Sequence, residues 1–112
     1  EISNSPLQSL TLLNDGVFFE AAQALGGIIA RQNEADEIRA PALFRRCLTR
    51  PPDTQERAMI VAFYRSQKQR FAAQELDAGV VAGASEGDLI ERAAWTTVAR
   101  ALLNLDEAIT KN

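Results

Sequence analysis

The sequence predicts an all-α fold, an antiparallel helical bundle of about five helices joined by short loops. Three observations support this prediction. Apolar residues recur every three or four positions along most of the chain, which is the spacing of one face of a helix. No stretch of useful length alternates apolar and polar residues, as a half-buried strand would. Most glycines and prolines fall between the helix-periodic segments, where they mark turns and loops.

The first predicted helix begins at the segment SPLQ, residues 5–8. Ser5 can accept hydrogen bonds from the free N–H groups of the first turn, and Pro6 suits that turn because it lacks an N–H. The apolar face of this helix consists of Leu7, Leu10 and Leu13. The segment NDG, residues 14–16, then interrupts the helix, and its Asp15 is placed to cap the next one.

The second predicted helix, residues 16–32, carries two adjacent glycines, Gly26 and Gly27. Its apolar face consists of Phe18, Ala22, Leu25 and Ile29. In an exposed helix interior a glycine costs about 1 kcal/mol relative to alanine. The glycine pair therefore either weakens the helix locally or permits close contact with a neighbouring helix.

The third predicted helix, residues 36–49, contains Pro41. A proline inside a helix removes one backbone donor and clashes with the preceding turn, so we expect a kink or a late start here. The apolar residues of this helix are Ile38, Leu43, Phe44, Cys47 and Leu48. The segment RPPDTQE, residues 50–56, ends it with two prolines, and a capping box between Asp53 and Glu56 starts the next helix.

Two further helices complete the predicted bundle. The fourth covers residues 54–73 and aligns Glu56, Ile60, Phe63, Gln67 and Phe71 along one face. Residues 74–84 could hold a short helix before glycines break it. The last helix, residues 87–110, follows the capping segment SEGD at residues 85–88. Its apolar stripe consists of Trp95, Val98, Leu102, Leu105 and Ile109.

Length and charge restrict the domain organisation and the partners. The 112 residues fit a single helical domain, residues 1–112, with residues 1–4 as a linker. The 12 basic and 15 acidic residues give a net charge of −3, which argues against a nucleic acid or an anionic membrane as partner. The uncharged apolar runs fall far short of the ~20 residues of a membrane span. Because the chain lacks an initiating Met, we expect it to be a piece of a longer protein.

The residue types present argue against a metal site, a cofactor or catalysis in the isolated domain. The chain has no His, which is the commonest general base and metal ligand. The acidic pairs Asp36/Glu37 and Asp106/Glu107 are adjacent in sequence, and adjacent helical side chains point about 100° apart. We therefore expect no catalytic, cofactor-binding or metal-binding residues, and no enzyme activity of this domain alone.

Cys47 is the single cysteine of the chain, which excludes an internal disulfide. It lies on the apolar face of a predicted helix, where a free Cys behaves as a small buried hydrophobe. Three arginines nearby in sequence could lower the pKa of its thiol, so a reactive Cys47 stays open.

Three apolar residues lie away from the main stripes of their helices: Leu12, Phe19 and Leu103. Single exposed apolar residues are common on protein surfaces, and helices in a bundle are often buried on two sides. Their occurrence on the two terminal parts of the chain nevertheless predicts a second contact surface. We therefore regard these three residues as candidates for docking to a partner.

Three segments in this order resemble one protein family. They are PLQSLTLLND (residues 6–15), FRRCLTRPPDTQE (residues 44–56) and WTTVARALLNLDE (residues 95–107). The segments are similar to the motifs P-L-Q-A-L-x-L-L-N-D-P, F-R-x-x-L-x-R-x-P-x-x-x-E and W-x-x-V-A-R-x-L-L-N-L-D-E-F. These motifs belong to the C-terminal part of the planctomycete domain of unknown function 1553.

The resemblance implies a C-terminal fragment of a large multidomain bacterial protein. Members of that family are mostly exported to the periplasm or cell surface, and many carry an N-terminal cytochrome c-like domain. The family domain has no established catalytic residues, so none is transferred to this chain. The sequence departs from the family at Gly16, where the family has Pro, at Ala108, where it has Phe, and at Pro41, inside a usually uninterrupted helix.

Two functional hypotheses of different classes follow. The first is a non-catalytic structural or interaction module that packs against the upstream part of its own chain or against a partner protein. A homodimer of the isolated piece is a further outcome of this hypothesis. The second is one wall of an enzyme or heme-redox site that upstream domains complete. It predicts a cleft with convergent polar groups, and a perturbed carboxylate or a reactive Cys47.

Overall fold

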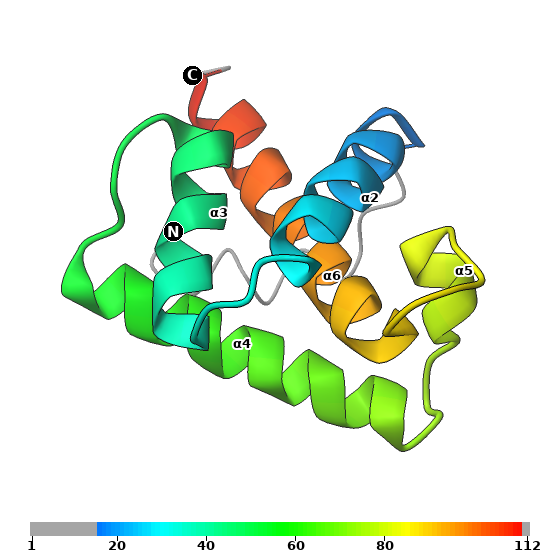
Figure 1. Ribbon diagram of the computed structural model, residues 1–112. Coiled ribbons are helices and arrows are strands. Elements are labelled where there is room, and N and C mark those ends of the chain that lie inside the picture. The colour runs from blue at the N-terminus through cyan, green and yellow to red at the C-terminus, as the bar shows by residue number, and fades with distance from the viewer. Residues whose placement is uncertain (1–15, 111–112) are drawn as a thin grey trace.

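The computed structural model describes the backbone of residues 16–110 and the side chains of residues 19–105. Within this part of the chain the fold is an all-α helical bundle with five helices and no strand, which confirms the predicted fold class. The helices are α2 (Gly16–Ala30), α3 (Asp36–Leu48), α4 (Thr54–Ala72), α5 (Ala78–Ala82) and α6 (Leu89–Thr110), as Figure 1 shows. The first predicted helix lies outside the described residues.

Helix α6 forms the centre of the bundle, because it contacts each of α2, α3, α4 and α5. Figure 1 shows α6 running through the middle of the molecule. The buried residues of α6 are Ala93, Ala94, Trp95, Thr96, Val98, Ala99, Ala101 and Leu102. Half of them are alanines, and such small side chains let several helices approach α6 closely. Trp95, Val98 and Leu102 of the predicted stripe are thereby confirmed as core residues.

Gly26 lies where α2 packs on α6. A Cβ atom at this position would lie 2.7 Å from the backbone nitrogen of Thr96 and 2.8 Å from its Cα. Both distances are far shorter than the normal contact distance between heavy atoms. Glycine is therefore required here for the two helices to touch. Of the two interpretations of the glycine pair, the structure supports a close helix contact at Gly26.

Helix α3 begins at Asp36 and continues through Pro41, so the expectation of a late start is wrong. Its first residue has no side-chain cap, because Ala35 precedes it. Side-chain contacts of Asp36, and not an N-terminal cap, hold the first turn in place. The carboxylate of Asp36 accepts hydrogen bonds from Arg39 and Arg65, and this anchors the first turn against α4. Pro41 cannot donate one backbone hydrogen bond of α3, and the helix nevertheless continues to Leu48.

The aspartate directly before each of three helices, α4, α5 and α6, caps the first turn of that helix. The predicted capping box of α4 is present: Glu56 N donates to Asp53 Oδ1 at 2.7 Å, and Asp53 N donates to Glu56 Oε1 at 3.0 Å. Asp77 caps the short helix α5, which confirms the helix expected within residues 74–84. Asp88 Oδ1 accepts from Glu91 N at 3.1 Å, and α6 accordingly begins directly after Asp88.

Candidate functional site

Arg39 is the only charged residue that is buried within residues 19–105, with 7% of its surface exposed. It lies on the same face of α3 as Leu43 and Cys47, at four-residue intervals, and this spacing directs its side chain inward. An unpaired charge in such a position would cost several kcal/mol of desolvation. The surrounding side chains therefore have to compensate it.

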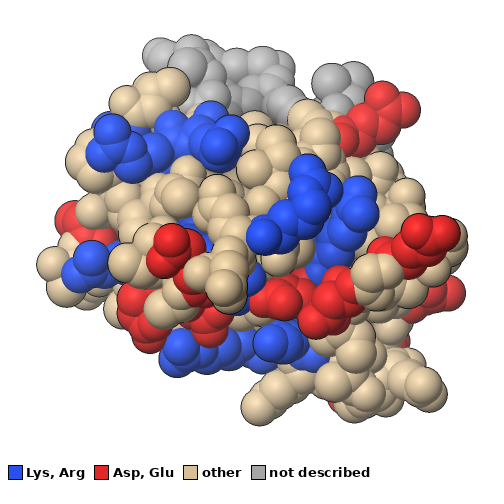
Figure 2. All heavy atoms as spheres, in the orientation of Figure 1, with Lys and Arg blue, Asp and Glu red and all other residues tan. Residues whose placement is uncertain are grey.

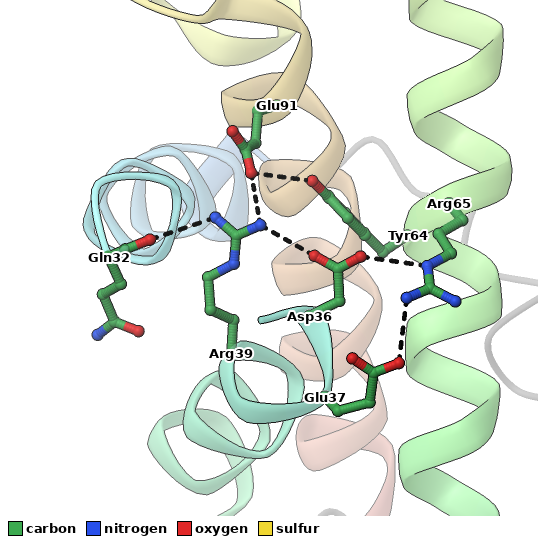
Figure 3. A network of polar contacts seen from close by, with 7 residues as sticks. All are labelled: Gln32, Asp36, Glu37, Arg39, Tyr64, Arg65 and Glu91. Carbon is green, nitrogen blue, oxygen red and sulfur yellow. Dashed lines mark hydrogen bonds and ion pairs between the residues drawn. The ribbon is translucent and has the colours of Figure 1, made fainter. Parts of the chain in front are cut away.

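Both terminal nitrogens of the Arg39 guanidinium are paired, as Figure 3 shows. Arg39 Nη2 donates to Asp36 Oδ1 at 2.9 Å and forms an ion pair with Glu91 Oε2 of α6. Arg39 Nη1 reaches the backbone oxygen of Gln32 at 3.4 Å. Arg39 therefore links the segment that precedes α3 to α3 itself and to α6.

Two residues of α4 extend this network. Tyr64 donates its hydroxyl proton to Glu91 Oε2 at 3.2 Å. Arg65 Nε donates to Asp36 Oδ2, and Arg65 Nη2 donates to Glu37 Oε2, each at 3.1 Å. Although adjacent helical side chains diverge, one guanidinium reaches both carboxylates, because its nitrogens lie apart from each other. We call the seven residues labelled in Figure 3 the Arg39 network; it connects α3, α4 and α6.

An aromatic stack borders the Arg39 network. The rings of Tyr64 and Trp95 are stacked, with centroids 3.9 Å apart and planes 16° from parallel. Arg39 Cζ lies 5.4 Å from the Trp95 ring centroid, and Lys68 Nζ lies 5.7 Å from that of Tyr64. A cation therefore approaches each ring of the pair. Such contacts contribute about 0.5–2 kcal/mol each, more when they are desolvated.

The network fixes the protonation state of its members. Burial opposes ionisation of Asp36, but the hydrogen bonds from Arg39 and Arg65 outweigh it and hold the pKa of the carboxyl below its usual value. Burial, together with the negative charge of Glu91, raises the pKa of the Tyr64 hydroxyl. Asp36 is therefore ionised and Tyr64 protonated at neutral pH. This arrangement holds helices together, and neither group can exchange a proton readily near pH 7.

The family model described as PSD1, protein of unknown function (DUF1553), matches residues 1–64. The chain belongs to this family. The match covers more than half of the 112 residues and includes the motif segments at residues 6–15 and 44–56. Comparison with curated proteins and with solved structures gave no match.

The structure places two of the three predicted docking residues of this DUF1553 chain. Phe19 of α2 is half-buried, and Arg100 of α6 lies over its ring, with Cζ 4.8 Å from the ring centroid. Leu103 is also half-buried and packs against the core. It follows Arg100 by three residues on α6, and so lies on the next turn of the same side. The third residue, Leu12, lies outside the described residues.

Cys47 of the DUF1553 chain is a core residue with 5% of its surface exposed, in agreement with its position on the apolar face of α3. Within the described residues, no group of three or more Cys, Asp or Glu side chains is arranged to hold a metal ion. No helix in that part of the chain is long and apolar enough to cross a membrane. Figure 2 shows basic and acidic side chains interspersed over the viewed face.

Sequence reasoning did not identify the Arg39 network, although a signal for it exists. Arg39 precedes Leu43 by four residues on α3, and Glu91 precedes Trp95 by four residues on α6. Each charged residue therefore continues an apolar face, where an unpaired charge is unfavourable. Two opposite charges that continue two apolar faces indicate a buried ion pair between those helices.

Proposed function

We propose that this domain is a non-catalytic helical module with a structural or interaction role in a larger exported bacterial protein. The observation that supports this role is the Arg39 network. The buried guanidinium of Arg39 and its partners connect three helices to one another. Two ionisable groups of the network, Asp36 and Tyr64, have pKa values shifted away from neutrality. A rigid helical module of this kind presents a fixed surface to whatever it packs against.

The docking surface in this proposal is the ridge formed by Phe19, Arg100 and Leu103. It combines two half-buried apolar side chains with a guanidinium, and interfaces are enriched in such aromatic and arginine residues. Leu12 remains a candidate docking residue in the proposal, because it lies off the main stripe of the first predicted helix, and it lies outside the described residues. The partner is the upstream part of the same full-length chain, or a second protein with a complementary apolar and acidic surface.

The experiment compares Leu103→Glu with a matched control, Val80→Glu. Val80 of α5 is 66% exposed, so the control adds the same charge without loss of packing. We expect the 112-residue chain to bind the separately produced upstream part of its parent in analytical ultracentrifugation. Leu103→Glu should weaken this association at least tenfold, and Val80→Glu should not change it. Absence of association for the unmodified chain would refute the upstream part as the partner, and unfolding of Leu103→Glu in circular dichroism would refute the proposed surface.

The alternative, one wall of an enzyme or heme-redox site, is favoured by an open groove of about 710 Å³ between the end of α4 and the start of α6. Its acidic lining residues are Glu75, Asp77 and Asp88. Asp77 and Asp88 also cap helices, through hydrogen bonds of 3.2 Å and 3.1 Å to backbone nitrogens. Thiol labelling of the native chain tests this alternative, since a Cys47 that reacts only after unfolding removes its predicted nucleophile.

The export of the parent protein, to the periplasm or the cell surface, also belongs to this proposal. It is supported by the resemblance to exported planctomycete proteins. Fractionation of cells that express the full-length parent tests it directly. We expect the protein in the periplasmic or surface fraction, and recovery from the cytosol alone would refute this part of the proposal.

A further inference from the structure

A cavity of about 250 Å³ lies between α4, α5 and α6. Gln67 and Phe71 of α4 line one side of it, Val81 of α5 lines another, and Arg100 of α6 lines a third. Figure 1 shows these three helices meeting on the side of the molecule away from α3. We call this cavity the α4–α6 pocket. It is separate from the Arg39 network, with which it shares no lining residue.

Gln67 is a buried polar residue without a hydrogen-bond partner for its side chain within the described residues. Its exposure is 5%, and the other buried polar residues, Arg39 and Thr96, both have partners. The unpaired side-chain atoms that are fully sealed within this part of the chain belong to Arg39, Arg92 and Trp95. The amide of Gln67 is not among these sealed atoms, and Gln67 lines the α4–α6 pocket.

Gln67 lies on the apolar face of α4, between Ile60 and Phe71, and no group in the described part of the chain pairs with its amide. Water in the pocket is then left to hydrogen-bond this amide. A ligand that accepts a hydrogen bond from the amide can replace that water. The unpaired side chain of Gln67 thus supports a binding site at the α4–α6 pocket independently of the volume of the pocket.

The charged residues around the pocket favour a ligand with a negative charge. Arg70 and Arg100 border it, and none of its lining residues in the described part of the chain is an Asp or a Glu. The neighbouring groove, which shares Phe71 and Leu76 with the pocket, has the opposite character: its charged lining residues are all acidic. Arg70 pairs with Glu75 at 3.3 Å, but both side chains are well exposed, and an ion pair of this kind is weak.

We propose that the α4–α6 pocket binds a small organic carboxylate. The carboxylate accepts hydrogen bonds from the Gln67 amide and lies in the positive field of Arg70 and Arg100. Its apolar body packs against Phe63 and Phe71 on the pocket wall. A volume of 250 Å³ equals the share of about eight water molecules in liquid water, which suits an aromatic acid of the size of phenylacetate. The pocket shares Arg100 with the proposed docking ridge, so its test uses Gln67 and Arg70, which lie outside that ridge.

The test is a titration of the 112-residue chain with phenylacetate, followed by the NMR signals of the Gln67 side-chain amide and of the arginine Nε–H groups. We expect saturable shifts of the Gln67 amide signals. The neutral analogue phenylacetamide and the cationic analogue phenethylamine should bind at least about tenfold more weakly, because neither offers an anionic acceptor to the Gln67 amide and the arginines. No saturation with phenylacetate, or equal affinity for the neutral analogue, would overturn the proposal.

Four variants distinguish the proposed site from nonspecific attraction to a basic surface. Gln67→Leu and Arg70→Gln should each weaken phenylacetate binding about fivefold or more. Glu75→Gln should strengthen it, because it removes a nearby negative charge and the competing partner of Arg70. Arg57→Gln is the matched control: it removes an exposed arginine of the same helix that does not line the pocket, and should leave the affinity unchanged.

The variants also separate binding from a purely structural role of Gln67. If the residue served packing alone, Gln67→Leu would change the thermal midpoint without any effect on the phenylacetate affinity, and the proposal would fail. Equal loss of affinity in Arg57→Gln and Arg70→Gln would overturn it as well, since the arginines would then act only through net charge.

Discussion

At Arg39 a guanidinium lies against the Trp95 ring and between the carboxylates of Asp36 and Glu91. Its removal would leave those two carboxylates without their shared partner, while 22% and 17% of their side-chain surfaces remain exposed. Breaking a buried pair by removal of one member typically costs 3–5 kcal/mol. Because both carboxylates remain partly accessible to water, we expect the loss of stability on removal of Arg39 to lie near the lower end of that range.

We therefore expect Arg39→Met to lower the free energy of unfolding by about 3 kcal/mol. The matched control is Arg50→Met, which breaks the ion pair between Arg50 and Glu56 at 3.0 Å. Half of the Arg50 side chain is exposed, so this control should cost less than about 1 kcal/mol. Urea denaturation of both variants measures the difference, and equal losses would show that Arg39 contributes no more than a surface pair.

Tyr64 is the only tyrosine of the chain, so its ionisation can be followed by tyrosinate absorbance in the near ultraviolet. Burial and the Glu91 charge raise its pKa in the folded state. The protonated hydroxyl therefore stabilises the fold below the unfolded pKa of about 10, and this contribution is lost as the pH rises further. We expect tyrosinate to appear only together with unfolding, and a reversible titration near pH 10 in the native state would contradict the buried hydrogen bond.

At the scale of the helices, local sequence predicts the start of a helix where a capping residue precedes it. The capping box of α4 and the cap of α6 could be predicted because Asp53, Glu56 and Asp88 act within one turn of their own position. The helix over residues 36–49 could be predicted, but its start at Asp36, ahead of Pro41, could not be distinguished from a late start. This start depends on Asp36 and its partner Arg65, which follows 29 residues later in the sequence.

The contact of α2 with α6 depends on Gly26, and Gly26→Ala is its test. A Cβ there would meet the Thr96 backbone, so we expect a loss of about 1–3 kcal/mol from overpacking, although alanine favours the helix itself.

Gly79→Ala is the matched control, because a Cβ at that position would lie at ordinary contact distances of 3.5 Å and 3.6 Å. We expect no loss of stability for this variant. A thermal midpoint of Gly26→Ala equal to that of Gly79→Ala would mean that the two helices can separate at little cost.

For the molecule as a whole, the fold class could be predicted because it depends on the spacing of apolar residues along the chain. The candidate sites could be predicted only in part. Phe19 and Leu103 were visible as apolar residues off their stripes, whereas the Arg39 network joins residues from three helices. Gln67 is aligned with Ile60 and Phe71 in the sequence, but only the structure reveals the pocket at its amide.

The family match ends at Tyr64, in the middle of α4 (Thr54–Ala72). A fragment of residues 1–64 would lack α6 and with it Trp95 and Glu91, the partners of Tyr64 and Arg39. We expect this fragment to show little helix in circular dichroism and no cooperative unfolding, in contrast to the 112-residue chain. A cooperative transition of the fragment would show that α6 is not needed to form the core.

The alanine-rich face of α6 limits how this sequence can diverge. Ala93, Ala94, Ala99 and Ala101 are all fully buried, and each lies where a larger side chain would displace a packed neighbour. The volume of the side chain, more than its polarity, thus determines which substitutions this face of α6 tolerates. Exposed positions away from the proposed docking ridge can therefore accept larger side chains, whereas the buried face of α6 requires small ones.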